Sequence, residues 1–251
     1  MKNLFKAELY KLFKLPVYKF LLAVLFIMVI LDNFLKLSNT KTASGYEWLC
    51  FMKSRMLWNI VVIIILTAVF VGSEFSKRTF MMGLLCGESR RNFILAKFAA
   101  IFTGSLPFLA IYAITGFTTE TLMNGFGMPS DAHLLPVVFR EIFYCILIHL
   151  NVISVAMLMT MLIKNEIFNI ILITAGFYYT YVLIANLRFM SEGILSFLVS
   201  ILRFSIIFQT VSPGSYPQYQ PPIWIAIISS AAVVAGTSYM ATHLFTNKDL
   251  K

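Results

Sequence analysis

The chain has 251 residues, of which 59% are hydrophobic, 15% aromatic and only 12% charged. A soluble domain carries about 25% charged residues, and the mean hydropathy here is +0.84. The composition therefore argues against a soluble enzyme, a secreted disulfide scaffold and a disordered chain, and it indicates an all-α, polytopic membrane protein. The net charge of +9 fits such a protein, because its cytoplasmic loops are enriched in Lys and Arg. The few cysteines and histidines are scattered, so neither a disulfide nor a metal site is expected.

The N-terminal fourteen residues have the pattern of a basic amphipathic helix. Phe5, Leu9, Leu12 and Phe13 recur near helical spacing, with lysines between them. We expect this helix to lie in the cytoplasmic membrane interface. A plain membrane anchor and a helix that contacts a partner protein fit the pattern equally well. Pro16 ends the helix and begins the first span.

Six apolar stretches follow that are long enough to cross a bilayer core of about 30 Å. They are 17–35, 56–73, 98–117, 141–163, 167–187 and 223–245. With the N-terminus inside, 13 of the 20 basic residues fall on cytoplasmic segments. The sequence therefore predicts one domain with six spans and both termini in the cytoplasm, although four basic residues in the first outer loop oppose this orientation.

The segment 74–97, between the second and third spans, carries the most specific pattern in the chain. It has an apolar face, a glycine that can stop a helix, and then Ser89, which can cap the next helix, followed by Arg90 and Arg91. A loop that only sets topology needs no such pattern. We therefore expect a short cytoplasmic helix that docks on a partner.

The outer region between the fifth and sixth spans contains a further apolar segment, 193–208. It is only 16 residues long, is interrupted by Arg203, and precedes four of the eight prolines. Segments of this kind are often re-entrant or interfacial. A re-entrant element is expected here, and a seventh span is the alternative, which would place the C-terminus outside.

The segment 74–97 resembles the cytoplasmic coupling region of type-2 ABC transporter permeases, in particular the group of lantibiotic-immunity, bacitracin-resistance and peptide-toxin exporters. The opening Ala7-Glu8-Leu9-Tyr10-Lys11-Leu12 resembles the interfacial helix of that family, and Phe245-x-x-Lys248-Asp249-Leu250 resembles its C-terminal signature. Arg78 departs from the family, in which many members have Gly before the Thr. The resemblance implies an ATPase-coupling interface that includes Glu74, Arg78, Thr79, Phe80, Leu84, Gly87, Glu88, Ser89, Arg90 and Arg91, with Lys97 at the start of the third span, and an interfacial helix with Phe5, Glu8, Leu9 and Leu12.

Charged and polar residues near or within the spans are candidates for a substrate path, because a charge at the bilayer centre costs about 2.5–3.5 kcal/mol on the insertion scale. Structural explanations are more common for such residues: anchoring at a span end, an interhelical hydrogen bond, or aromatic packing. The candidates are Asp32, Glu141, His149, Tyr178 and Tyr181.

Three classes of function remain open. None of the twelve glycines is followed by lysine, so the chain has no phosphate-binding P-loop. As an ABC permease it would not itself be an enzyme; ATP and Mg²⁺ would bind to two partner ATPase subunits, and it would pair with an identical or homologous permease in a bacterial plasma membrane. The family implies export of amphipathic or antimicrobial peptides and no nucleic-acid partner. The alternatives are an intramembrane protease or acyltransferase, for which no catalytic spacing is present, and a passive pore.

Overall fold

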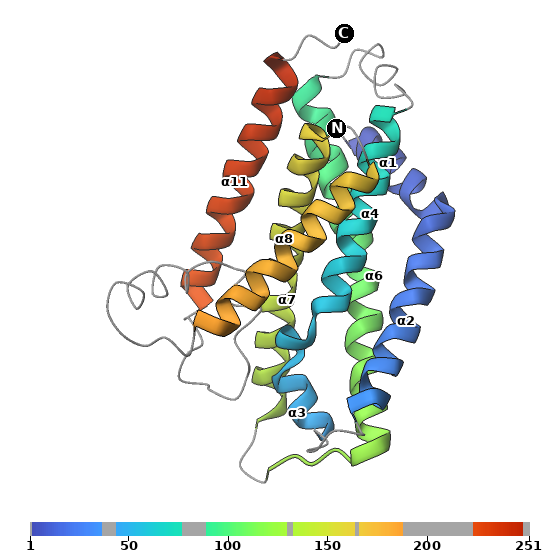
Figure 1. Ribbon diagram of the computed structural model, residues 1–251, viewed down its shortest axis with the longest axis vertical. Helices are drawn as coiled ribbons and strands as arrows, with labels where there is room; N and C mark the ends of the chain where they lie inside the picture. Colours follow the sequence, from blue (N-terminus) through green and yellow to red (C-terminus); the bar gives the residue numbers. More distant parts are fainter. Residues whose placement is uncertain are drawn as a thin grey trace.

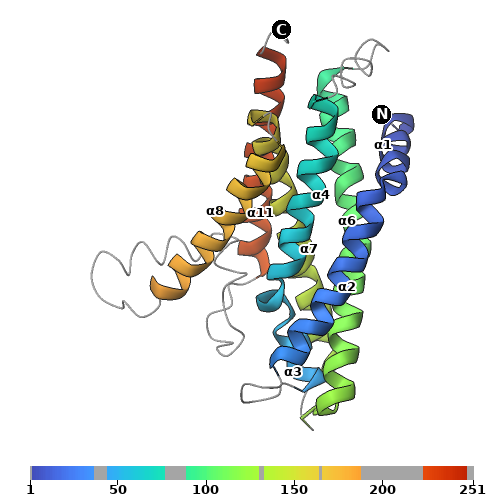
Figure 2. The ribbon, with the colours of Figure 1, turned by 45° about the vertical axis from the view of Figure 1, so that its right-hand side comes forward.

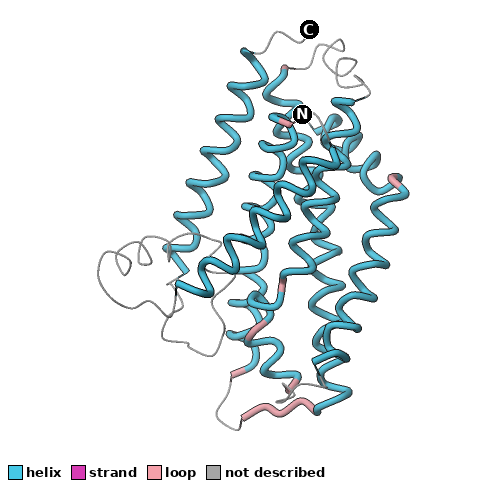
Figure 3. The backbone as a smooth tube through the Cα atoms, in the orientation of Figure 1, coloured by secondary structure: helices cyan, strands magenta, loops and turns pink. Residues whose placement is uncertain are grey.

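The computed structural model describes residues 2–36, 44–76, 89–129, 133–163, 166–187 and 223–247, and their regular secondary structure is helical throughout (Figures 1 and 3). The elements in chain order are α1 (Lys2–Lys14), α2 (Pro16–Lys36), α3 (Gly45–Cys50), the 3-10 turn η1 (Met52–Arg55), α4 (Leu57–Ser76), α6 (Arg90–Asn124), α7 (Leu134–Leu162), α8 (Glu166–Leu187) and α11 (Ile223–Asn247).

Five of these helices are long and apolar enough to cross a membrane: α2, α4, α6, α7 and α11. The expectation of an all-α protein with several spans is therefore confirmed. The predicted span 167–187 corresponds to α8, whose described side chains form an apolar stretch over Ile167–Gly176. The predicted coupling helix and the re-entrant segment fall within 77–88 and 188–222, which lie outside the described residues.

The chain runs up and down through the bundle. Figure 1 places α1, the end of α4, the start of α6 and the end of α11 at one end, called here the α1 end, and it places α3 with residues 125–129 at the other, called the α3 end. Among the described residues, the helix ends that the sequence assigns to the inner side lie at the α1 end. Of those assigned to the outer side, the end of α2, α3 and the end of α6 lie at the α3 end, whereas α8 ends and α11 begins short of it (Figure 1).

Two helices are longer than the predicted spans. α6 has 35 residues instead of the 20 predicted, and α7 begins at Leu134 rather than Glu141. A search for apolar runs ends a span at the first polar residues, but a helix can include threonines whose hydroxyls donate to the carbonyls of the preceding turn. Thr118 and Thr119 do so, to the carbonyls of Ile114 and Thr115 at 2.8 Å each.

Side-chain caps define where helices begin at both ends of the bundle. Ser89 accepts from the backbone N–H of Asn92 at the start of α6, as the sequence predicts. Ser44 and Glu47 form a reciprocal capping box at the start of α3. Gly125, with φ of 78°, ends α6 in a conformation that favours glycine.

The centre of the bundle is α4, which packs against α2 on one side and against α7 and α8 on the other, while α6 contacts α1, α2 and α3 (Figure 2). α4 and α7 are the most deeply buried spans, whereas α2 and α11 present large apolar side chains outward, among them Phe20, Phe26, Trp224 and Ile228. An outward apolar surface on the spans is what a bilayer requires.

Two glycines of α6 let other elements approach its backbone closely. A Cβ at Gly104 would lie 2.2 Å from Leu12 of α1, and a Cβ at Gly116 would lie 2.0 Å from the indole ring of Trp48 in α3. Leu12 and Trp48 are both almost fully buried. These contacts hold α1 and α3 against the same helix, at points about 18 Å apart along its axis.

Candidate functional site

Four charged side chains converge at the α1 end and form an ion network that consists of Glu8, Lys11, Glu74 and Lys97. The ammonium of Lys97 lies 3.0 Å from Glu8 Oε2 and 2.7 Å from Glu74 Oε2. Lys11 contacts Glu8 Oε1 at 2.6 Å and Glu74 Oε1 at 3.5 Å. Two cations thus alternate with two anions, and the network joins α1, the end of α4 and the start of α6.

The network is buried at its centre and open at one edge. The side chains of Glu8 and Lys97 are 1% and 2% exposed, whereas that of Lys11 is 54% exposed. Lys97 also lies over the ring of Phe70, with its ammonium 4.3 Å from the centroid. Buried charges persist only when they are paired in this way. The arrangement therefore links α1, α4 and α6 through paired, largely buried charges.

The network sets the ionisation of its members on α1. Burial alone would raise the pKa of Glu8, but the ammonium of Lys97 and hydrogen bonds from Lys11 and Lys97 hold it below its ordinary value. Burial would lower the pKa of Lys11, but the carboxylates of Glu8 and Glu74 raise it. Both groups are charged at neutral pH.

This leads to a pH prediction for Glu8→Gln. A carboxyl whose pKa is lowered on folding contributes stability above its unfolded pKa, near 4.5, and that contribution is lost as the pH falls through the folded value. At pH 7 the variant should unfold with a free energy about 1.5–3 kcal/mol smaller than that of the parent, as expected for losing charge-assisted hydrogen bonds. The measurement is unfolding of the detergent-solubilised protein at a series of pH values. The difference in free energy of unfolding between the parent and the variant should decrease below pH 4.5. A difference that does not change with pH would contradict the role of an ionised Glu8.

The structure thus brings together three residues that the resemblance singled out separately, Glu8, Glu74 and Lys97. It also shows which residues of the N-terminal helix face the bundle. Glu8 and Leu12 are its buried residues, Phe5 and Leu9 are half-buried, and Phe13 is 40% exposed. The buried face therefore includes a carboxylate, that of Glu8, which pairs with Lys97.

Only part of the predicted ATPase-coupling interface lies within the described residues. Ser89 caps α6, Arg91 is exposed on its first turn, and the side chain of Arg90 is outside the described set. Six further residues of that interface also lie outside it: Arg78, Thr79, Phe80, Leu84, Gly87 and Glu88. Glu74 and Lys97, at the two ends of the segment, are described, and the ammonium of Lys97 lies 2.7 Å from Glu74 Oε2.

The predicted substrate-path residues that the structure describes lie on three different helices. Asp32 is half-buried on α2, Glu141 and His149 are buried two helical turns apart on α7, and Tyr178 is exposed on α8. The side chain of Tyr181 is outside the described set. Within the described residues, no three His, Cys, Asp or Glu side chains gather in a metal-binding arrangement.

His149 has the structural explanation that the sequence favoured, an interhelical hydrogen bond. Its Nδ1 donates to the carbonyl of Cys145 at 2.8 Å, and its Nε2 lies 3.3 Å from the amide of Asn59 on α4. The structure has Asn59 Oδ1 at this position. A neutral ring that donates from Nδ1 can only accept at Nε2, so a hydrogen bond here requires the amide turned with its NH2 toward the ring. The turned amide would also give a partner to Asn59 Nδ2, which is otherwise buried without one.

Glu141 belongs to a second charged group at the α3 end, which sequence reasoning missed. Lys53 of η1 and Arg140 lie 3.9 and 3.4 Å from Glu141 Oε1, and the ammonium of Lys53 is 4.5 Å from the centroid of the Tyr144 ring. The sequence suggested that Glu141 reaches the membrane surface, but its side chain and that of Lys53 are each 1% exposed. Burial lowers the pKa of Lys53, and Glu141 partly offsets this effect. We call Lys53, Arg140 and Glu141 the α3-end ion cluster.

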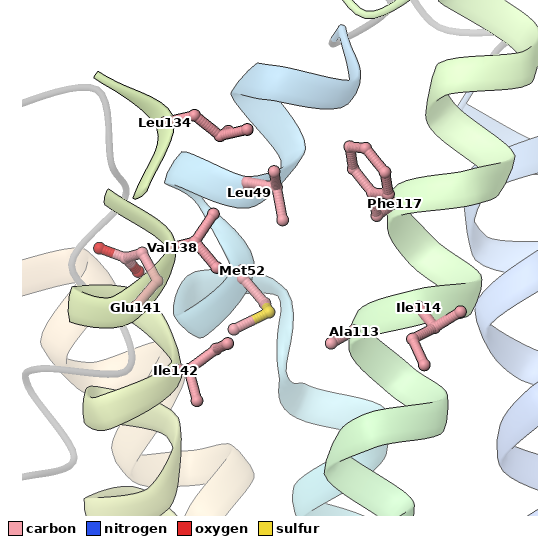
Figure 4. Close-up of a pocket in the computed structure, with 9 residues that line it drawn as sticks. All are labelled: Leu49, Met52, Ala113, Ile114, Phe117, Leu134, Val138, Glu141 and Ile142. Carbon is pink, nitrogen blue, oxygen red and sulfur yellow. The ribbon is translucent and has the colours of Figure 1, made fainter. Parts of the chain in front are cut away.

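An apolar pocket of about 280 Å³ adjoins this cluster (Figure 4). Leu49 and Met52 from α3 and η1 form its back, with α6 on one side and α7 on the other. In Figure 4 the carboxylate of Glu141 points away from the side chains of Met52 and Phe117. The remaining lining residues are Ala113, Ile114, Leu134, Val138 and Ile142.

Comparison with known proteins identifies no relative: no family model, no curated protein and no solved structure matches this chain.

Proposed function

We propose that this protein is the membrane subunit of an ATP-driven exporter of the ABC type. It would act with a second permease, identical or homologous, and with two cytoplasmic ATPase subunits that bind ATP and Mg²⁺. The cargo would be amphipathic or antimicrobial peptides, moved out of the cell or membrane. The multi-span helical fold and the lack of a P-loop in the sequence are compatible with this role.

The proposal depends mainly on where the ion network of Glu8, Lys11, Glu74 and Lys97 lies in the bundle. Its members Glu74 and Lys97 flank the segment that resembles an ATPase-coupling region, and both contact Glu8 or Lys11 of α1. A displacement of that segment would be transmitted through α4 and α6 and through α1 at once. Rigid-body motion of packed helices is a common route for such transitions.

The test of this function is the double variant Arg90→Glu with Arg91→Glu. Reversing charges in a desolvated interface costs on the order of 2–5 kcal/mol of binding, so the ATPase should be lost on copurification. Insertion should be unaffected, because Arg91 is exposed on the first turn of α6. Lys248→Glu is the control variant, with the same sign of change elsewhere on the predicted inner side.

Membrane level and ATPase recovery are measured together for both variants. Full recovery of the ATPase with normal transport by the double variant would contradict the assignment of this segment. Failure of any P-loop ATPase to copurify with the parent chain would contradict the ABC function itself.

The proposed orientation, with both termini in the cytoplasm of a bacterial cell, gives a labelling prediction. A membrane-impermeant thiol reagent should reach Cys50 from outside and Cys86 only from the cytoplasmic side. Cys50 is half-buried and burial raises the pKa of its thiol, so its labelling should be slow at neutral pH and accelerate as the pH rises. Cys50→Ser and Cys86→Ser supply the controls. Labelling of Cys86 in intact cells would overturn the orientation.

A further inference from the structure

The side of α1 that faces away from the bundle is basic and aromatic. Glu8 and Leu12 are the buried residues of this helix. Residues four apart lie on the same side of a helix, and an exposed stripe with this spacing runs along α1, with an aromatic side chain beside it. We call the following residues the lysine face: Lys2, Lys6, Tyr10 and Lys14, together with Phe13.

The lysine face carries positive charge that α1 itself does not neutralise. Glu8 is the acidic residue of this helix, and its buried carboxylate is directed inward, 3.0 Å from the ammonium of Lys97. The ammonium of Lys14 lies over the ring of Tyr10, 5.3 Å from its centroid. The ion network therefore uses the one carboxylate of α1, and it leaves three lysines on the opposite side of the helix with no carboxylate of α1 among them.

The lysine face lies directly beside the first membrane span. α1 ends at Lys14, and the candidate span Pro16–Leu35 begins two residues later. Phe13 packs edge to face on Tyr18 of α2, with the ring centroids 5.2 Å apart, and this contact holds the two helices together. Figure 2 shows α1 at the edge of the bundle, next to the start of α2. Lys19, on the first turn of α2, is exposed as well.

The mixture of side chains favours a lipid surface over a protein. Tyr10 is 63% exposed and Phe13 is 40% exposed. Exposed aromatic rings among lysines, next to a span, are typical of a helix that lies in the headgroup region. Four or more basic residues beside a span or on an amphipathic helix are typical of binding to anionic headgroups. An acidic protein would neutralise the same lysines, but it would not explain aromatic side chains exposed where a span begins.

We propose that the lysine face of α1, extended by Lys19, binds the anionic phospholipid headgroups of the adjacent leaflet. The ammonium groups contact lipid phosphates, and the rings of Tyr10 and Phe13 lie among the glycerol groups and the upper acyl chains. The ion network holds the other side of α1 against α6, so this helix links the lipid surface to the bundle. The proposal does not rest on the export function, because it needs only the chain and a bilayer.

The experiment measures which lipid lies next to α1. A fluorophore is attached to Ala7→Cys, an exposed position one helical turn from Tyr10. Cys50→Ser and Cys86→Ser remove two competing thiols, and Cys145 is buried. The full chain is placed in phosphatidylcholine nanodiscs. Phosphatidylglycerol or phosphatidylcholine that carries a nitroxide quencher close to its headgroup is then added at increasing mole fraction, and the two quenching curves are compared.

At low mole fraction, labelled phosphatidylglycerol should quench at least about fivefold more effectively than labelled phosphatidylcholine, the ratio expected for one basic side chain near an anionic surface. Lys2→Gln with Lys6→Gln and Lys14→Gln should make the two lipids equivalent. The matched control replaces the same three lysines with arginine, which keeps the charge, and it should keep the preference. Salt raised from about 0.05 to about 0.5 M should weaken the preference in the parent. A fluorophore at Leu122, which is 86% exposed at the α3 end, should show none.

Three results would overturn the proposal. The first is equal quenching by the two lipids in the parent at low salt. The second is a preference for phosphatidylglycerol that persists in the triple glutamine variant. The third is weak, equal quenching that disappears when a cytoplasmic ATPase is added, which would assign the lysine face to a protein. The salt series on the parent needs no lysine variant, so it tests the proposal even if the triple glutamine variant does not fold.

Discussion

Replacing Lys97 with methionine should lower the free energy of unfolding by about 3–5 kcal/mol, the largest effect expected from a single change in this chain. Removing one partner of a buried ion pair is costly because the remaining charge stays buried. Here Glu8 would retain only the half-exposed Lys11, and Glu74 would lose its closest cation. Methionine keeps most of the side-chain volume, so the loss reports charge rather than a cavity. The measurement is denaturant unfolding of the solubilised protein, followed by tryptophan fluorescence.

Lys19→Met is the control, because Lys19 is exposed at the start of α2, and it should change stability by less than about 0.5 kcal/mol. A second arm separates charge from packing. Adding Glu8→Gln and Glu74→Gln to Lys97→Met removes the uncompensated anions and should recover part of the lost stability. Equal stability of Lys97→Met and Lys19→Met would show that the ion network does not hold α1 to the bundle.

The second large effect is expected at Gly116, where alanine should destabilise the protein by about 1–3 kcal/mol through overpacking. An added Cβ would lie 2.0 Å from Trp48 Cζ2 and 2.4 Å from Cε2. The indole cannot move aside easily, because Trp48 is almost fully buried and packs at 5.4 Å, between ring centroids, on Tyr112. The same unfolding measurement applies, and Trp48 emission should shift as the ring is displaced.

Gly236→Ala provides the matched comparison, since nothing lies within 4 Å of a Cβ at that helical position. There the change should stabilise α11 by up to about 1 kcal/mol, because glycine is a poor helix former. If alanine lowers the free energy of unfolding at Gly116 and raises it at Gly236, packing against Trp48 is the cause of the loss at Gly116. A stabilising effect at both positions would contradict the close contact between α3 and α6.

The helical spans could be predicted from the sequence because a bilayer imposes a simple rule on length and polarity. However, that rule identifies only the residues that cross the apolar region of the bilayer. It does not determine at which residue the helix ends. α6 therefore extends well past its predicted span, through Thr118 and Thr119 to Asn124. Caps are local, so Ser89 was recognisable from three or four neighbouring residues.

The ion pairs could not be predicted, because they depend on which helix faces meet. Glu8 and Lys97 are 89 residues apart in the chain, and Lys53 and Glu141, on η1 and α7, are 88 residues apart. The sequence marked Glu8, Glu74 and Lys97 only through a resemblance, and it counted Lys53 as an ordinary basic residue of an outer loop. In the sequence, Lys53 directly follows Met52, and Glu141 is the only acidic residue of its predicted span. Neither pattern indicates that the two side chains meet.

The length of α6 has a consequence for the membrane that this chain fits. Lys97 and Glu120 are buried in ion pairs near its two ends, and the residues between them are uncharged. At 1.5 Å per residue these two charges are about 35 Å apart along the helix. That separation exceeds an average hydrocarbon thickness of about 30 Å by a few ångströms. In a thinner bilayer, α6 would have to tilt, or the bilayer would have to thicken locally around it. The elements that contact the two ends of α6 would move with it. The thickness of the surrounding bilayer thus acts directly on the angle between α6 and the rest of the bundle.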